Sequence, residues 1–314
     1  MKTKHLFFFC ALWGMLVASV APAQADAQGN MMRALNAKYS ASVVTLQLVL
    51  KSSAGGQSDQ SQLEADGIVI DPSGLVVTTN TAIDPASMYT GVMGEEFAGR
   101  ISSTVVSARI RLASGEEIPA RVVLRDKDRN VAFMRPLRRP SKPLAWVNFR
   151  GNNGARMGDP VYIMGRLGKS GSRSSEATMQ RIVSIIDKPR RVYVLESNTY
   201  SYLGNVVFNE SGQPLGLMSM RVVRGGRSFS AAESFLAIVI PAGDVWEVAL
   251  QAPQASAVRD ARPAPAPAPA PANKPSASTR AGAASASRRD SRGASVRNGV
   301  SGSRGVSGSK PAGR

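Results

Sequence analysis

Residues 67–80 read Gly-Ile-Val-Ile-Asp-Pro-Ser-Gly-Leu-Val-Val-Thr-Thr-Asn. Two apolar runs rich in β-branched residues, 67–71 and 75–79, flank the short segment Pro72-Ser73-Gly74. β-Branched residues favour strands, whereas clustered Asp, Pro, Ser and Gly favour a tight turn. This stretch therefore predicts a strand, a turn and a second strand that folds back on the first.

The same pattern continues along the chain. A second hairpin is expected from residues 105–112 and 118–125, which flank Ser114-Gly115. Further strand candidates are residues 43–49, 131–135, 161–164, 178–186, 191–196, 206–208, 214–220 and 235–240. Helices are predicted in the body only at residues 31–39 and 245–250. Many short strands with few helices predict an all-β sandwich or barrel, and the pattern alone does not choose between the two.

The first 25 residues have the composition of a secretory signal peptide. Lys2 and Lys4 precede an apolar run over residues 6–20, and Ala23-Gln24-Ala25 supplies small residues at the expected cleavage position. We therefore expect export with cleavage after Ala25, and a retained N-terminal anchor is the alternative. No later apolar run is long enough to span a membrane, so no transmembrane segment is expected in the mature chain.

Cysteine and histidine are nearly absent from the sequence. It has one of each, Cys10 and His5, and both lie in the predicted signal peptide. The mature chain would then have no disulfide and no structural zinc site of the usual ligands, and we expect neither a metal nor a cofactor. An exported protein without disulfides is typical of a bacterial periplasm or cell surface.

Composition divides the rest of the chain into a body, residues 26–252, and a tail, residues 253–314. The body is rich in Val, Ile and Leu and is long enough to bury a core. The tail consists almost entirely of Ala, Pro, Ser, Gly and Arg, which is typical of disorder. The chain has a formal net charge of +17, and the tail supplies eleven Lys or Arg against two Asp. The charge therefore indicates what the tail binds rather than how the body folds.

The tail itself has two parts. Residues 263–272 alternate Pro and Ala, which favours an extended spacer. The candidate polyanion-binding residues beyond it are Arg288, Arg289, Arg292, Arg297 and Arg304, which stand among Ser and Gly. No aromatic side chain is available there for base stacking, so anionic envelope polymers are favoured over nucleic acid. A solvated linker without a specific partner is the alternative interpretation.

Several stretches of the body, taken in order, resemble the Deg/HtrA family of trypsin-like serine proteases. They are Ser42–Thr45, Gly67–Asn80, Gly115–Asp126, Met157–Val161, Ile163–Gly165, the single residues Gly204, Asn209, Gly212 and Gly216, and Ile240-Pro241. The resemblance covers residues 33–250 and implies two six-stranded β-barrels with a cleft between them. The expected fold is thus all-β: a trypsin-like double barrel with a short N-terminal helix, a C-terminal helix and a disordered tail.

The resemblance also implies where a catalytic triad would lie, and this sequence departs from it at each position. Thr81 stands at the histidine position, Asn130 at the aspartate position and Leu203 at the serine position. Ser201 replaces the glycine that helps to form the family's oxyanion hole. A threonine cannot act as a base near neutral pH, an asparagine carries no charge, and a leucine has no nucleophilic atom.

We therefore predict no catalytic residues and interpret the chain as an exported pseudoprotease. It would act in the cell envelope as a binding or scaffold module for a protein or an extended peptide. Strand addition needs only backbone hydrogen bonds, and the candidate peptide-binding residues are Leu217, Met218, Ser219 and Met220. The sequence leaves the ligand and the oligomeric state open.

Two other interpretations of the function are compatible with the sequence. In the first, the chain is a divergent serine endopeptidase with a non-standard catalytic group. A Ser-Lys dyad of Ser201 with Lys169 or Lys188 is one form that such a group could take, although the spacing selects neither lysine. In the second, the chain binds envelope polyanions through its basic tail, and the barrels only carry that tail. Reaction of a serine with an active-site phosphonate would favour the first, and loss of binding on tail deletion would favour the second.

Overall fold

The computed structural model describes residues 21–88, 101–222 and 235–253, with side chains from residue 27 onward. Most of the predicted signal peptide lies outside these residues. So does the whole basic stretch, including Arg288, Arg289, Arg292, Arg297 and Arg304. Export and polyanion binding therefore stay predictions.

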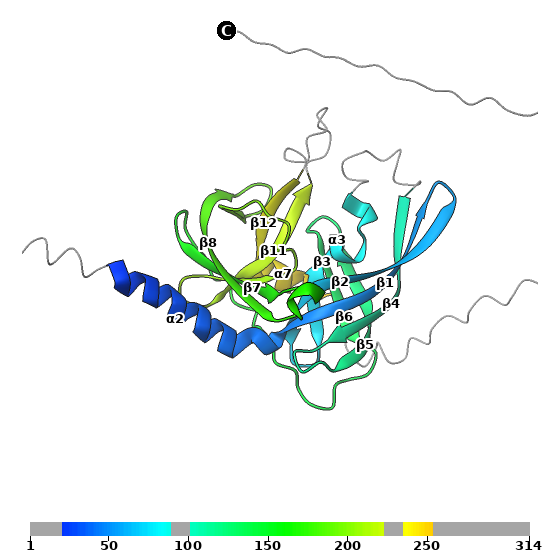
Figure 1. The fold of residues 1–314 in the computed structure, drawn as a ribbon. Helices are drawn as coiled ribbons and strands as arrows, with labels where there is room; N and C mark the ends of the chain where they lie inside the picture. Colours follow the sequence, from blue (N-terminus) through cyan, green and yellow to red (C-terminus); the bar gives the residue numbers. More distant parts are fainter. Residues whose placement is uncertain (1–20, 89–100, 223–234, 254–314) are drawn as a thin grey trace, which may run out of the picture. The chain divides into compact units, whose positions relative to one another are not determined.

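The first half of the body folds into a closed antiparallel barrel of six strands (Figure 1). Its strands are β1 (Val43–Ala54), β2 (Gln57–Asp71), β3 (Leu75–Thr79), β4 (Ile101–Arg111), β5 (Glu117–Asp126) and β6 (Val131–Pro136). Around the barrel they follow the order β1-β2-β3-β6-β5-β4. The hairpin predicted from residues 67–80 is confirmed as the end of β2, a turn and β3, with Gly74 donating its N–H to Asp71.

The second half forms another closed six-stranded barrel. Its strands are β7 (Pro160–Arg166), β8 (Ser175–Ile186), β9 (Val192–Leu195), β10 (Val206–Phe208), β11 (Pro214–Val222) and β12 (Phe235–Pro241), in the spatial order β10-β11-β12-β9-β8-β7. The predicted all-β double barrel is confirmed. Closure leaves neither sheet with a long unpaired edge in its barrel.

Strands β3 and β6 are buried along their whole lengths, because their two faces belong to two different hydrophobic clusters. Val76 and Met134 belong to a cluster that fills the first barrel. Val77 and Phe133 belong to a larger cluster that also includes second-barrel residues such as Leu217. One face of these strands fills their own barrel while the other packs toward the second, which holds the two barrels in one core.

The helices of the described body lie near its two ends and directly after β3. They are α2 (Ala21–Tyr39), α3 (Asn80–Ile83) and α7 (Ala242–Ala249), with short 3-10 turns η1 (Ser40–Ser42) and η2 (Lys169–Gly171). The N-terminal helix starts earlier than the predicted residue 31, so it runs through the expected cleavage position. Among the described residues, none of the helices is both long and apolar enough to cross a membrane.

The contacts of α2 explain its position. Leu35 is buried, the Tyr39 ring stacks on Phe208 of β10 with centroids 4.8 Å apart, and Met31 lies against Gly212. The C-terminal part of the helix therefore packs on the second barrel, although its chain leads into β1 of the first.

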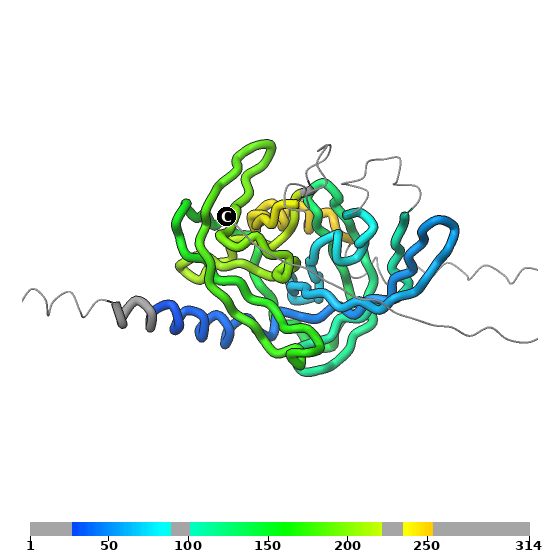
Figure 2. Tube along the Cα trace, turned by 45° about the horizontal axis from the view of Figure 1, so that its top comes forward, coloured from blue at the N-terminus to red at the C-terminus, as the bar shows by residue number. Residues whose placement is uncertain are grey.

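The hairpin of β1 and β2 is longer than the sequence predicts. The two strands pair without interruption from Val43↔Ile68 to Ala54↔Gln57. Figure 2 shows their far end, in blue, projecting beyond the rest of the first barrel. The added residues are mainly polar and exposed, so they carry no apolar pattern that could have marked them as strands.

Candidate functional site

Asn130 is hydrogen-bonded to Thr81, and the family resemblance implies that these two residues stand at the aspartate and histidine positions of a triad. It lies in the turn between β5 and β6 with φ of +52°, a left-handed conformation that Asn adopts more readily than most residues. Its side-chain Oδ1 accepts a hydrogen bond from the backbone N–H of Thr81 at 3.0 Å. Its backbone carbonyl accepts one from the N–H of Asn80, also at 3.0 Å. Asn130 thereby fixes the start of α3, which carries Thr81.

The same asparagine reaches across to the second barrel. Its Nδ2 donates to the backbone carbonyl of Met220 in β11 at 3.2 Å. The hydroxyl of Ser219 donates to the carbonyl of Asn130 at 3.3 Å. Both side chains are buried. The structure thus gathers Thr81, Asn130, Ser219 and Met220 at the contact between the barrels.

Ser201 and Leu203 lie in the loop over residues 199–205, which is held to β11. The N–H of Gly204 donates to the carbonyl of Met218 at 2.9 Å, and the N–H of Met218 donates to the carbonyl of Asn205 at 2.8 Å. Ser201 is exposed, and its hydroxyl is 3.2 Å from that of Thr199. Leu203 is half-buried. No hydrogen bond links Ser201 or Leu203 to Thr81 or Asn130 among the described residues.

The loop over residues 199–205 contacts the first barrel at Gly204. Its φ is +88°, and an added Cβ would lie 2.7 Å from the backbone carbonyl oxygen of Asp66 in β2. That oxygen also accepts the hydroxyl of Thr78 at 2.7 Å. The position therefore requires glycine both for its backbone angle and for its close approach to β2.

The candidate peptide-binding residues Leu217, Met218, Ser219 and Met220 are all buried in β11. On one edge they pair with β12, from Leu217↔Ile240 to Met220↔Ala237. On the other edge Met218 uses both its backbone groups on residues 204 and 205, and Met220 gives its carbonyl to Asn130. Most of the backbone groups in this stretch therefore already have partners within the chain.

Arg129, the residue before Asn130 in the chain, belongs to a charged pair. The Arg129 guanidinium is 2.9 Å from Asp126 and 4.0 Å from Glu247 of α7. Burial raises the pKa of Asp126, but the backbone N–H and guanidinium of Arg129 outweigh it, so that pKa lies below its ordinary value. This carboxylate stays ionised near neutral pH and is already bound to its own neighbour.

Neither of the two lysines considered as a base for Ser201 contacts it among the described residues. Lys169 of η2 is 3.9 Å from Glu64 of β2. Lys188 follows β8, and no contact between it and Ser201 is found in the described ranges. Nor do three or more His, Cys, Asp or Glu side chains come together there in a way that could hold a metal ion.

One charged residue that the sequence analysis did not single out is Asp66. Its carboxylate accepts the backbone N–H of Arg166 in β7 at 2.8 Å, so it joins the first barrel to the second. The two residues lie one hundred positions apart in the chain, so no local sequence pattern links them. An acidic residue directly before a buried apolar strand, Gly67–Ile70, is the one sequence signal that could have drawn attention to it.

Two closed six-stranded barrels, packed on a shared core with a polar contact region between them, define a trypsin-like double-barrel protein. In agreement with that architecture, residues 65–217 match the family described as the trypsin-like peptidase domain. The match runs from β2 to β11 and includes Thr81, Asn130, Ser201 and Leu203. The chain therefore carries a trypsin-like peptidase domain.

Proposed function

We propose that this domain is non-catalytic and serves as a binding or scaffold module for a protein or an extended peptide. The observation that carries the proposal is the hydrogen bonding of Asn130. Its amide both accepts from Thr81 and donates to the carbonyl of Met220. An ionised carboxylate cannot donate, so this environment matches an asparagine and disfavours the negative charge that would orient an imidazolium.

The sequence supports the same proposal. Its only histidine, His5, lies in the predicted signal peptide and outside the described residues. Acyl transfer by a serine needs a base within hydrogen-bond reach of the nucleophile. At the positions implied by the family resemblance, Thr81 offers no base and Leu203 offers no nucleophile.

A peptide would most readily reach β11 beyond Met218, where fewer backbone groups are engaged. The carbonyl of Met220 is held by one bond of 3.2 Å from Asn130, whereas both backbone groups of Met218 have partners at 2.8–2.9 Å. Strand addition draws its affinity from main-chain hydrogen bonds and needs no catalytic residue. The proposed ligand is therefore an extended segment of another protein.

The experiment uses a fluorescently labelled, permanently unfolded protein as the probe. Binding is followed by fluorescence anisotropy, and the same samples are then separated on a gel to detect cleavage. We expect saturable binding with the probe intact. Cleavage of the probe would overturn the non-catalytic proposal, and an intact probe without binding would overturn the peptide-binding part of it.

The location and the tail form a second part of the proposal. We propose that the protein is exported to the cell envelope and that its tail attaches it to anionic polymers there, because the tail carries eleven Lys or Arg against two Asp. Deleting residues 253–314 should abolish binding to dextran sulfate at low salt and leave binding of the unfolded protein unchanged. Equal retention of both chains on the polyanion would contradict the role of the tail.

A further inference from the structure

Asp66 occupies a junction of three segments. It lies in β2 opposite Thr45 of β1, and its carboxylate accepts the N–H of Arg166 at the end of β7. Its backbone carbonyl accepts a hydrogen bond from the Thr78 hydroxyl. The same carbonyl lies so close to Gly204 that it leaves no room for a side chain there. One residue of the first barrel thus contacts both a strand and a loop of the second.

The guanidinium of Arg166 does not neutralise this carboxylate directly. Its nitrogens donate to three backbone carbonyls: Val43 at 2.7 Å, Ser40 at 2.8 Å and Arg173 at 3.0 Å. Within the described ranges, no Lys or Arg nitrogen lies within ion-pair distance of Asp66. The carboxylate is therefore stabilised mainly by a neutral backbone donor, which is weaker than a charged one.

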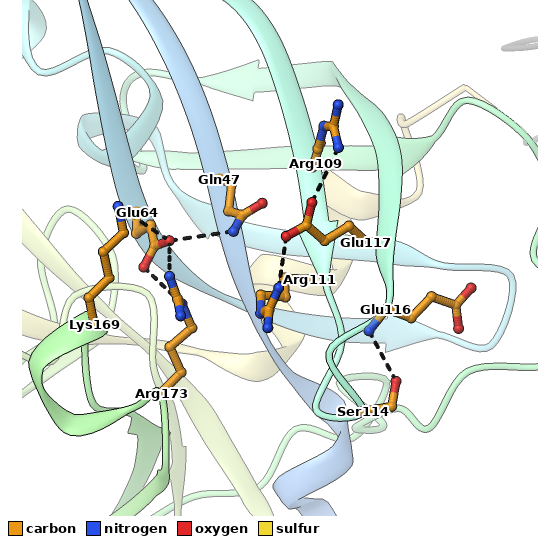
Figure 3. Close-up of polar contacts among 9 residues, drawn as sticks. All are labelled: Gln47, Glu64, Arg109, Arg111, Ser114, Glu116, Glu117, Lys169 and Arg173. Carbon is orange, nitrogen blue, oxygen red and sulfur yellow. Dashed lines mark hydrogen bonds and ion pairs between the residues drawn. The ribbon is translucent and has the colours of Figure 1, made fainter.

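The other charged residues around the junction do not neutralise the negative charge of the Asp66 carboxylate. Glu64, two residues earlier in β2, holds Arg173 at 2.7 Å and Lys169 at 3.9 Å (Figure 3). Glu176 of β8, opposite Gly165, adds a second negative charge near Asp66. The remaining neighbours, in β1, in β3 and in the loop at residues 204–205, are uncharged.

Burial raises the pKa of Asp66 to about 6, and the Arg166 amide and charge offset this only in part, while Glu176 raises it further. A carboxyl whose pKa is higher in the folded than in the unfolded chain favours folding when protonated. That contribution is complete below the ordinary value of 3.8 and is lost as the pH rises to about 6. Ionisation of Asp66 therefore disfavours the folded arrangement around it.

The loop over residues 199–205 rests on this junction. Gly204 packs on the carbonyl of Asp66, and the buried side chain of Asn205 lies where a Cβ on Gly165 would be, next to Arg166. The Oδ1 of Asn205 has no hydrogen-bond partner among the described residues. The segment that carries Ser201 and Leu203 therefore lies directly against the backbone of Asp66.

We propose that Asp66 makes the contact between the two barrels sensitive to pH. In mildly acidic conditions its carboxyl is protonated and the loop over residues 199–205 is held firmly on β2; at neutral pH its ionised carboxylate loosens that contact. This regulation goes beyond the proposed function and does not depend on it. It concerns the contact between the loop and β2, whatever the protein binds.

The test compares Asp66→Asn with the wild-type chain. Asparagine keeps an acceptor for the N–H of Arg166 and removes the charge. Unfolding by urea is measured from about pH 4 to about pH 8, and we expect the folding equilibrium of the variant to exceed that of the wild type by up to roughly a hundredfold above pH 7. The difference should disappear toward pH 4. A difference that does not change with pH would overturn the proposal.

The matched control is Glu64→Gln in the same strand. The hydrogen bond and charge of Arg173, with help from Lys169, outweigh the effect of burial and lower the pKa of Glu64, so its ionised form favours folding. This control should lose stability at neutral pH, the opposite sign to Asp66→Asn. Equal signs for the two variants would contradict the assignment of the effect to Asp66.

A local readout and a second variant complete the test. Hydrogen exchange of the peptide that covers residues 199–205 should be slower in Asp66→Asn than in the wild type at neutral pH, and equal in the two near pH 4. If Asp66→Asn does not fold, Glu176→Gln serves instead, because removing that negative charge should move the transition of the wild-type profile to lower pH. An unmoved transition would then overturn the proposal.

Discussion

Replacing Gly204 by alanine should lower the free energy of unfolding by about 2–4 kcal/mol. The φ of +88° is unfavourable for a side chain, and the new Cβ would lie 2.7 Å from the carbonyl oxygen of Asp66 and 3.2 Å from the Thr78 hydroxyl. The closest atom belongs to the backbone of a barrel strand, so it cannot rotate away. Relief would require the loop to separate from β2. Urea unfolding monitored by tryptophan fluorescence measures the loss.

Gly158 provides the matched control. Its φ of +90° is nearly the same, but an added Cβ would meet no atom within 4 Å. Gly158→Ala should therefore show only the backbone cost, about 1 kcal/mol. If both variants lost the same stability, the close approach of the loop to β2 would make no energetic contribution, and the seat described for residues 199–205 would be wrong.

Replacing Asn130 by aspartate should destabilise the protein by about 2–3 kcal/mol at neutral pH. The change is nearly isosteric, but it turns the Nδ2 donor into an acceptor that faces the carbonyl of Met220 at 3.2 Å. The site is 8% exposed, so water cannot relieve the repulsion. Burial should raise the pKa of the new carboxyl, and the loss should therefore shrink as the pH falls and the carboxyl becomes protonated.

Asn209→Asp is the control for that experiment. Asn209 is 7% exposed, and its Oδ1 accepts two backbone N–H groups, from Ser211 at 3.1 Å and Gln213 at 3.0 Å. Its Nδ2 donates only to the side chain of Gln213 at 3.4 Å. A carboxylate fits that environment, so this variant should lose much less stability. If Asn130→Asp were as stable as the wild type at neutral pH, the donor role of Asn130 would be refuted.

The sequence predicted the strands that line the core and missed the parts of β1 and β2 that lie outside it. β10 matches its predicted bounds, and β3 follows the quoted turn at Leu75, because both are short, apolar and fully buried. The outer halves of β1 and β2 went unrecognised, since their polar side chains face water and their turn at Gly55-Gly56 adopts positive φ. Backbone pairing alone extends them beyond the core.

The site shows the same division. The resemblance to a known family placed Thr81 and Asn130 in one region, and the structure joins them by a hydrogen bond. It could not reveal that Asn130 also bonds to Met220, or that Asp66 meets Arg166, because these contacts link segments far apart in the chain. They arise from how two barrels pack, and no local pattern of residues records that arrangement.

The most direct test of the non-catalytic account is the reaction of the full chain with a fluorophosphonate, read by intact mass and then by peptide mapping. The wild type and Leu203→Ser are treated in parallel, because a serine at position 203 still lacks a base. The account predicts no mass increase in either chain. Stoichiometric labelling of one serine, at Ser201 in the wild type or at position 203 in the variant, would contradict it and would require another base in the site.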